Sequence, residues 1–186
     1  LRLLSDIHHD AQWLIQMVEN LLSVTKISGE GAKLKKQEEV VEEIVAEAVG
    51  KIQKRFSSVD IRVRVPDELL LVPMDAMLIE QVLINLMENA IRHSGSQKPI
   101  YVTIKHLWNR VYFSVLDQGI GIEAERLPHI FDGTTNSSKS SDSSRGLGIG
   151  LPICKSIITA HGGEIHAKNN ENGGASFMFI LTMKGA

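Results

Sequence analysis

Apolar residues recur at alternating steps of three and four positions over the first 25 residues of the chain. This spacing is typical of the seam of a coiled coil or helical bundle, and further apolar residues widen it, which favours a bundle over a two-stranded zipper. The seam comprises Leu4, Ile7, Ala11, Leu14, Val18, Leu21 and Thr25, widened by Leu3, Ile15, Met17 and Leu22. Gly29 and Gly31 break the pattern, so we expect the helix to end near Ile27 or Ser28.

Two interpretations of this first helix stay open. Its terminal position and the glycine break favour a separate bundle or dimer element over residues 1–28, followed by one domain over residues 29–186. The alternative is a helix that packs on its own domain.

The remainder of the chain mixes strand and helix patterns without strict alternation, which predicts an α+β fold with a mixed sheet and helices on one face. We expect a short strand within Lys33–Val40 leading into a helix to about Lys54, a strand over Asp60–Val65, a short apolar run over Leu69–Val72 stopped by Pro73, and a helix over 76–92. Strands over Ile100–His106 and Arg110–Leu116 around a Trp108–Asn109 turn, a helix over Gly150–Ala160, and strands over Glu164–Lys168 and Ala175–Met183 around Gly173–Gly174 complete the prediction. Asp75 is the expected cap of the middle helix, with Met77, Leu78, Val82, Leu83, Leu86 and Ala90 facing inward.

Composition excludes several classes of protein. Hydrophobic residues make up 43% of the chain, enough for a core, and a net charge of -2 gives no general attraction to nucleic acid. No apolar run reaches the roughly 20 residues that a membrane span needs. Cys154 is the single cysteine, so no internal disulfide can form. Because the chain starts at Leu1 without methionine, we expect a fragment of a longer protein, and a membrane-anchored parent stays possible.

The first chemically informative cluster lies on the predicted middle helix. Asn85 and Asn89 are four positions apart, so their side chains project from one helical face, and Arg92 and His93 follow a turn later. Amide oxygens are suitable ligands for Mg²⁺, and an arginine can hold phosphate. The alternative is a pair of ordinary polar positions on the solvent side.

Two glycine-rich segments follow. In Asp117–Gly121, at a strand end, the carboxylate can accept a hydrogen bond from an exocyclic amine such as that of adenine, and the glycines permit close backbone approach. In Gly146–Gly150, just before a helix, free backbone N–H groups can hold phosphate oxygens. Between them Thr134–Arg145 is polar and without large apolar residues, so we expect it to be mobile. Taken alone, each of the two glycine-rich segments also fits an ordinary turn.

The order of these segments resembles the nucleotide-binding fold of gyrase-type ATPases, Hsp90-type chaperones, MutL-type proteins and histidine kinases. Gln81–Ala90 is similar to the N box of sensor histidine kinases, Asp117–Gly121 to their G1 box, Gly146–Leu151 to their G2 box, and His161–Gly163 to their characteristic ending. The resemblance covers essentially the whole chain, with Leu4–Ile27 as the second helix of the dimerisation hairpin. Gly146–Lys155 and Gly173–Ala175 look most like the Kdp-type potassium-responsive sensors.

This resemblance implies a two-layer Bergerat-type sandwich with a mostly antiparallel sheet, and ATP and Mg²⁺ as cofactors. Asn89 would ligate Mg²⁺, Asn85 and Arg92 would face the triphosphate with catalytic roles, and Asp117 would read adenine. The expected pocket also contains His93, Gly119, Gly121, Ile122, Gly146, Leu147, Gly148, Ile149, Gly150 and Leu151. Thr134–Arg145 would be the ATP lid, and charge alone suggests Lys139 or Arg145 as a contact of the γ-phosphate.

Asn85 also separates a kinase from an ATPase. The ATPases of this superfamily carry a glutamate four residues before the Mg²⁺-ligating asparagine, and an amide cannot replace it as a general base. Glu88 lies on a different face and is not expected to substitute. The resemblance therefore implies γ-phosphate transfer to a histidine on a first dimerisation helix that this sequence lacks, since His9-Asp10 is followed by Leu14 where the family has proline.

The implied partners are a response regulator and a second copy of the chain, which would dimerise through the first helix. No nucleic acid is expected, and a membrane would be reached only through segments outside this cytoplasmic part. Phe131-Asp132 supplies half of the family's phenylalanine box, but Thr134 and Thr135 stand where a second aromatic is expected. This departure leaves open an alternative, a nucleotide-binding scaffold or phosphatase-biased module with little kinase activity.

The remaining polar residues receive structural interpretations. His161 is expected to end a helix, where a positive charge would suit the helix dipole. Cys154 is expected to be a buried small residue, and Asn169 and Asn170 to be structural. We expect no structural metal, because no histidine has a zinc-binding spacing with Cys154.

Overall fold

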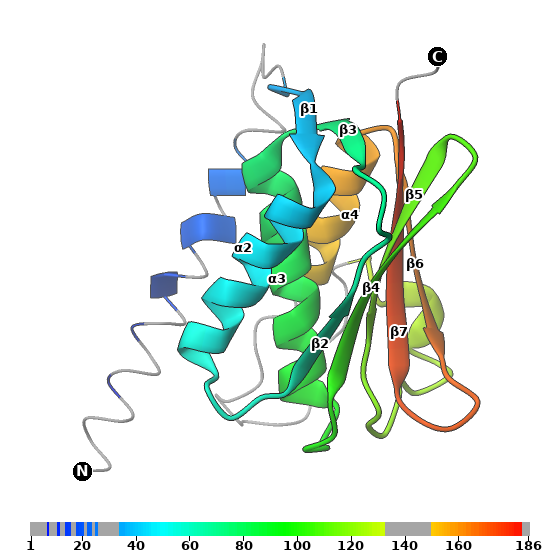
Figure 1. Ribbon diagram of the computed structural model, residues 1–186. Helices are drawn as coiled ribbons and strands as arrows, with labels where there is room; N and C mark the ends of the chain where they lie inside the picture. Colours follow the sequence, from blue (N-terminus) through cyan, green and yellow to red (C-terminus); the bar gives the residue numbers. More distant parts are fainter. Residues whose placement is uncertain are drawn as a thin grey trace.

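The computed structural model describes residues 34–132 and 150–183 continuously (Figure 1). Near the N-terminus it describes a set of helical residues: Ile7, Ala11, Leu14, Ile15, residues 18–20, Leu22, Ser23 and Thr25. The predicted helix end at 27–28, the Thr134–Arg145 stretch and Gly146 to Ile149 lie outside the described residues.

Five strands form the main sheet, in the order β2-β4-β5-β7-β6. These are β2 (Ile61–Arg64), β4 (Ile100–Leu107), β5 (Arg110–Leu116), β7 (Ala175–Thr182) and β6 (Glu164–Asn169). Among the strands of the described residues, β2 and β4 pair in parallel and the other pairs of this sheet are antiparallel. Two further strands, β1 (Gln37–Val40) and β3 (Leu71–Met74), form a small antiparallel sheet.

Three helices cover one face of the main sheet: α2 (Val41–Arg55), α3 (Ala76–His93) and α4 (Gly150–Ala160). Figure 1 shows α3 between α2 and α4, with the sheet on one side. A short 3₁₀ helix spans Leu127–His129. The predicted α+β class, a two-layer sandwich of helices and a mixed, mostly antiparallel sheet, is confirmed.

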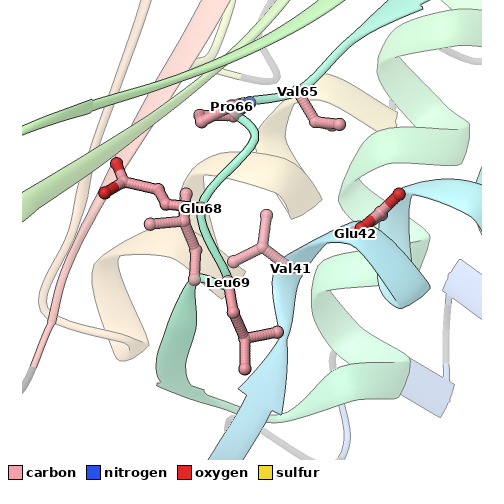
Figure 2. A pocket seen from close by; sticks show the side chains of 7 residues that line it. Val41, Glu42, Val65, Pro66, Glu68 and Leu69 are labelled. Atoms are coloured by element: carbon pink, nitrogen blue, oxygen red, sulfur yellow. The ribbon is translucent and has the colours of Figure 1, made fainter.

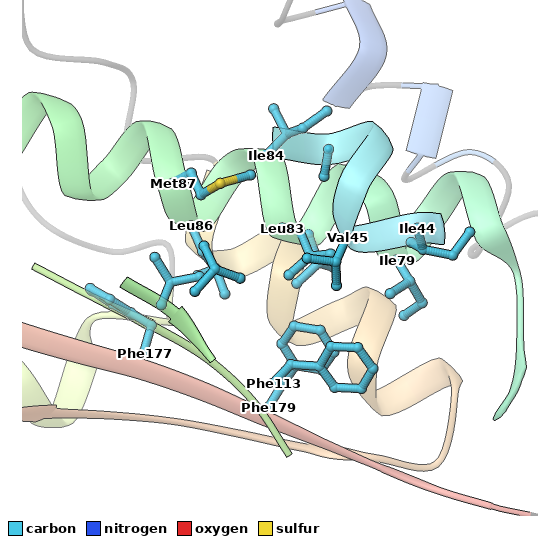
Figure 3. Packing of buried hydrophobic residues seen from close by; sticks show 14 of the residues in the cluster. Ile44, Val45, Ile79, Leu83, Ile84, Leu86, Met87, Phe113, Phe177 and Phe179 are labelled. Atoms are coloured by element: carbon cyan, nitrogen blue, oxygen red, sulfur yellow. The ribbon is translucent and has the colours of Figure 1, made fainter. Parts of the chain in front are cut away.

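The core lies between the helices and the sheet. Phe113 of β5 and Phe179 of β7 face each other in register, and their stacked rings are 4.5 Å apart. Figure 3 shows this pair facing the side chains of α3 and α2. Alternate residues of the central strands are buried because each strand turns one face to the helices and the other outward.

The central helix begins at the predicted residue, Ala76, and ends at His93, one residue later than predicted. The Asp75 side chain accepts a hydrogen bond from the Leu78 N–H and caps α3. Leu78, Val82, Leu83, Leu86 and Ala90 are buried as expected. Met77 is a correction, because its side chain is 67% exposed. Leu78 and Ile79 occupy the buried stripe of the first turn, so Met77, one position earlier, points out of the layer.

The strand β3 is a second correction, because it continues through Pro73 to Met74 instead of stopping at the proline. Pro73 pairs with Glu38 in a sheet of only two strands. A proline is tolerated there because its missing N–H can face away from the partner strand.

The described N-terminal residues lie beside α2 and α3, on the side away from the sheet (Figure 1). Asn20 and Ser23 are buried, with 8% and 7% exposure, whereas Ile7, Leu14 and Val18 of the seam are more than half exposed, at 56%, 53% and 56%. Among the described residues of this segment, Asn20 and Ser23 are buried and the seam residues are exposed. Within the described part of the chain, no helix is both long and apolar enough to cross a membrane.

Candidate functional site

Asp117 follows directly after β5 and is buried, with 5% exposure. Its backbone N–H donates to the Ala175 carbonyl (3.0 Å), which joins the loop to the start of β7. One carboxylate oxygen, Oδ1, accepts from the Gly119 N–H at 2.9 Å. The other oxygen, Oδ2, receives no hydrogen bond from the described residues, so the buried carboxylate can accept one from a ligand's amine.

The loop after Asp117 is packed against the end of α3. The Ile120 N–H donates to the Ser94 carbonyl at 3.0 Å. A Cβ on Gly119 would lie only 2.0 Å from the same carbonyl oxygen, so this position requires glycine. A Cβ on Gly174 would lie 2.1 Å from the Asp117 carbonyl oxygen, which makes the turn before β7 equally demanding.

Two asparagines that the sequence marked only as structural hold this loop. Asn169 Oδ1 accepts from the Ile122 N–H, and Asn169 Nδ2 donates to the Ile122 carbonyl, both at 2.7 Å. Asn170 Nδ2 donates to the Asp117 carbonyl at 3.3 Å. Gly121 adopts a φ of 78° between these contacts. The sequence signal for these two residues was a pair of asparagines before a diglycine turn. Their hydrogen-bond partners lie about 50 residues away in the sequence, and only the pairing of β5, β6 and β7 brings them together.

Asn85 is buried within α3, with 6% exposure, rather than on the solvent side. Its Oδ1 accepts from Gln81 Nε2 at 3.1 Å, and its Nδ2 donates to Asn20 Oδ1 at 3.2 Å. A Cβ on Gly150, the first residue of α4, would lie 3.7 Å from Asn85 Cγ. The fold therefore brings the predicted asparagine face of α3 to the start of α4, where the second glycine-rich segment ends.

The other predicted residues of α3 are more exposed than Asn85. Asn89 is partly exposed and His93 is exposed. The Arg92 guanidinium carbon lies 6.0 Å from the centre of the Phe56 ring, which follows α2. Arg92 is thus directed toward the α2 side of α3, and no hydrogen bond joins it to Asn85 or Asn89 within the described part of the chain.

Glu88 is buried and points toward α2, where its carboxylate is paired with Arg55. Burial raises the pKa of Glu88, while Arg55 and Arg92 act in the opposite direction. A carboxylate bound in this way is not available as a base at the Asn85 side chain, as expected from its position on the helix.

Phe131 and Asp132 anchor the chain just before the segment predicted as a lid. The Phe131 ring meets the Phe177 ring edge-on, with centroids 6.3 Å apart. Asp132 pairs with Lys155 of α4 and with His129, and these hydrogen bonds lower the pKa of Asp132. Lys139, Arg145, Gly146, Leu147, Gly148 and Ile149 lie outside the described residues, whereas Gly150 and Leu151 open α4.

His161 corrects the expectation of a charged helix end. It is buried, its Nε2 accepts from the Asp75 N–H at 3.0 Å, and its Nδ1 donates to the Ile157 carbonyl at 2.8 Å. An imidazole that accepts at one nitrogen is neutral, and burial lowers the pKa of His161 accordingly. Cys154 is fully buried as predicted, and burial raises the pKa of its thiol to about 12.

A shallow hollow lies elsewhere on the surface, between the start of α2 and the segment that precedes β3 (Figure 2). Its lining residues are Val41, Glu42, Val65, Pro66, Glu68, Leu69 and Leu70. None of the predicted site residues lines it, so the candidate site is the convergence of α3, the 117–122 loop and the start of α4.

A two-layer α+β fold with this convergence defines the class of protein, and comparison with known families agrees. Residues 74–185 match the family of histidine kinase-, DNA gyrase B- and HSP90-like ATPases, and the chain belongs to this family. The chain is 48% identical over 180 residues to the sensor protein KdpD of Clostridium acetobutylicum, and the match covers 96% of this chain and 20% of that protein. The chain thus spans about a fifth of the length of this curated relative.

Solved structures give the same assignment. The nucleotide-free catalytic domain of the histidine kinase ThkA superposes with a TM-score of 0.68 and 32% identity, covering 80% of this chain and 96% of that one. ThkA in complex with the response regulator TrrA superposes with a TM-score of 0.73 and 28% identity, covering 94% of this chain and 49% of that one. The resemblance to sensor histidine kinases, including the Kdp type, is confirmed.

Proposed function

We propose that this chain is the ATP-binding catalytic part of a bacterial two-component sensor histidine kinase. It transfers the γ-phosphate of ATP to a histidine on a first dimerisation helix outside this sequence, for relay to an aspartate of a response regulator. The 48% identity to a KdpD sensor protein supports this proposal, as does the likeness to ThkA, which was solved with a response regulator. Residues 1–28 are part of the dimerisation element, and residues 29–186 are the catalytic domain.

The observation that carries the choice of transfer over hydrolysis is Asn85. Its neutral amide lies between Gln81 and Asn20, at the position where the ATPases of the family carry a glutamate base. Glu88, the nearest acid along the helix, is held by Arg55. Without a carboxylate to activate water, the chain presents the γ-phosphate to an external nucleophile instead.

The nucleotide roles follow the site. Asp117 accepts a hydrogen bond from the adenine amine, which the buried position of its carboxylate supports. The loop glycines Gly119 and Gly121 leave room for the base, and Ile122 flanks it. Mg²⁺ neutralises phosphate charge, and the partly exposed Asn89 supplies an amide oxygen for it. Asn85, Arg92 and His93 face the triphosphate once nucleotide is bound, together with the chain from Gly146 to Leu151 and either Lys139 or Arg145.

Calorimetric titration with a non-hydrolysable ATP analogue tests the nucleotide site. We expect the wild-type protein to bind the analogue in a Mg²⁺-dependent manner, and Asp117→Asn to weaken binding at least about a hundredfold, because an amide turned toward the amine places donor against donor. The control is Asp67→Asn, an exposed carboxylate in the chain between β2 and β3. Equal binding by wild type and Asp117→Asn contradicts the assigned role.

Phosphotransfer distinguishes a kinase from a scaffold. With radiolabelled ATP, we expect acid-labile label on a separately purified cognate hairpin that carries the phosphoacceptor histidine, and none on this chain alone. Nucleotide binding without any transfer to the hairpin supports the scaffold or phosphatase-biased alternative, which the comparisons do not favour.

We further propose that the chain dimerises through the seam of its N-terminal helix. Ile7, Leu14 and Val18 are exposed and lie at heptad spacing, and a second copy is the partner that matches such a seam. We also propose that this part of the protein lies in the bacterial cytoplasm and is attached to a membrane only through segments outside this sequence. Protease accessibility in intact cells and in lysed cells tests the location.

A further inference from the structure

A hydrogen-bonded contact that the proposed function does not explain joins the N-terminal helix to the proposed nucleotide site. Asn20 Oδ1 accepts hydrogen bonds from Asn85 Nδ2 at 3.2 Å and from Gln81 Nε2 at 3.4 Å. Gln81 Nε2 also donates to Asn85 Oδ1, so three carboxamides form one closed network. All three side chains are buried, with 8%, 8% and 6% exposure for Asn20, Gln81 and Asn85.

The network occupies the Asn85 amide. Its oxygen has accepted from Gln81, one N–H is directed to Asn20, and the amide also contacts the Cys154 thiol. A phosphate oxygen or a metal-bound water needs access to the same polar atoms. Because Asn20 Oδ1 accepts an N–H of the buried Asn85 amide, a nucleotide oxygen that accepts from the same N–H has to displace Asn20.

The adjacent residue of the same helix adds to this contact. Glu19 lies close enough to Glu88 of α3 for its negative charge to oppose ionisation of that buried carboxylate. The docked helix therefore places a further acid beside Glu88, three positions after Asn85 in α3.

We propose that Asn20 and the nucleotide compete for Asn85, so that the docked N-terminal helix is a brake on Mg-ATP binding. This inference rests on the proposed nucleotide site. The contact links the helix whose seam we assign to the dimer with the residue that we assign to the triphosphate. A change in the N-terminal helix that withdraws Asn20 therefore raises the affinity for nucleotide without altering any nucleotide-contacting residue.

The direct test compares the affinities of wild type, Asn20→Ala and Ser23→Ala for the ATP analogue in the presence of Mg²⁺. We expect Asn20→Ala to bind at least about fivefold more tightly, because it removes both hydrogen bonds that Asn20 accepts and one bond of ordinary net strength already gives that factor. Ser23 is the matched control, because it is equally buried in the same helix and its hydroxyl donates only to the Glu19 carbonyl within that helix. We expect its affinity to equal that of wild type.

A second variant separates hydrogen bonding from packing. Asn20→Leu keeps the branched shape of the side chain and removes both the donor and the acceptor, so it too should bind the analogue more tightly. Unfolding curves establish that each variant is folded. If Asn20→Ala and Asn20→Leu bind nucleotide as wild type does, or more weakly, the competition is refuted while the nucleotide site stands.

Hydrogen exchange provides an independent readout. Addition of the Mg²⁺-bound analogue should accelerate amide exchange over residues 18–25 of the wild type, because the helix leaves α3, and should change little in Asn20→Ala. Binding of the analogue with unchanged exchange over these residues refutes the proposal. If no folded variant binds the analogue, the nucleotide site itself is wrong and the competition falls with it.

Discussion

At the scale of single residues, the candidate site depends on positions where only one type of side chain is tolerated. Gly119 lies against the Ser94 carbonyl, and Gly174 lies against the Asp117 carbonyl, so the loop that carries Asp117 is pressed between α3 and the turn before β7. Asn169 and Asn170 then fix the backbone of the loop through their amides. The orientation of the Asp117 carboxylate follows from these contacts and not from Asp117 itself.

Gly119→Ala should disrupt this loop. A Cβ 2.0 Å from the Ser94 oxygen forces the backbone apart, and we expect a loss of about 1–3 kcal/mol in the free energy of unfolding together with loss of nucleotide binding. The matched control is Gly50→Ala in α2, where a Cβ meets nothing within 4 Å. Since alanine is the better helix former, this control should stabilise the protein by about 0.5–1 kcal/mol.

Urea unfolding monitored by circular dichroism measures both variants. A Gly119→Ala protein with the stability and nucleotide affinity of wild type contradicts the close approach of the loop to Ser94.

At the scale of elements, α2 and α3 are joined by two ion pairs of different burial. Arg55 pairs with Glu88, with side-chain exposures of 23% and 8%, whereas Lys51 pairs with Glu80, with exposures of 58% and 10%. In the inner pair, burial favours the protonated form of Glu88, and the positive charge of Arg55 favours its ionised form. The outer pair has a well-solvated lysine and contributes less.

Arg55→Ala should destabilise the protein by about 2–3 kcal/mol, because it leaves the Glu88 carboxylate buried without its partner. Lys51→Ala should cost less than about 1 kcal/mol. Adding Glu88→Gln to Arg55→Ala removes the unpaired charge and should restore much of the loss. Denaturant unfolding of the four proteins at pH 7 gives the comparison, and equal losses for Arg55→Ala and Lys51→Ala exclude an unequal role.

At the scale of the whole molecule, the N-terminal helix has two different faces. Asn20 is hydrogen-bonded to Gln81 and Asn85 of α3 and Ser23 is buried, while Ile7, Leu14 and Val18 remain exposed. Both initial interpretations of the helix therefore describe part of its surface. Asn20 bonds to the domain, and the seam is the surface that we assign to a second copy.

Sedimentation velocity over a range of protein concentrations tests the assembly. We expect a wild-type mass that rises from monomer toward dimer with concentration, and a monomer at every concentration for Leu14→Glu, because a charge in the seam opposes helix packing. Leu69→Glu is the control, since Leu69 is 71% exposed outside the seam. A wild-type chain that stays monomeric, or a dimer that survives Leu14→Glu, excludes the seam as the interface.

Much of the fold could be predicted from local patterns. The bounds of β5 and α4, the cap at Asp75 and the turn at Trp108 depend on periodicity, capping and turn residues, which act within a few positions along the chain. The wrong predictions for Met77 and Pro73 have causes in the immediate surroundings of each residue. Met77 is apolar but belongs to a first turn already filled by its neighbours, and Pro73 is tolerated because its sheet has only two strands.

The sequence by itself determined the family, the elements and the residue types of the site, because motif order and hydrophobic period are properties of the chain. Only the tertiary structure decided which distant residue each of these polar side chains is hydrogen-bonded to. Asn85 is hydrogen-bonded to Asn20, 65 positions away in the sequence, and Asn169 is hydrogen-bonded to Ile122, 47 positions away. His161 is neutral because its Nε2 accepts from the backbone N–H of Asp75, 86 positions away. Such partners are set by how helices and strands pack, and packing depends on the whole chain at once rather than on any local spacing.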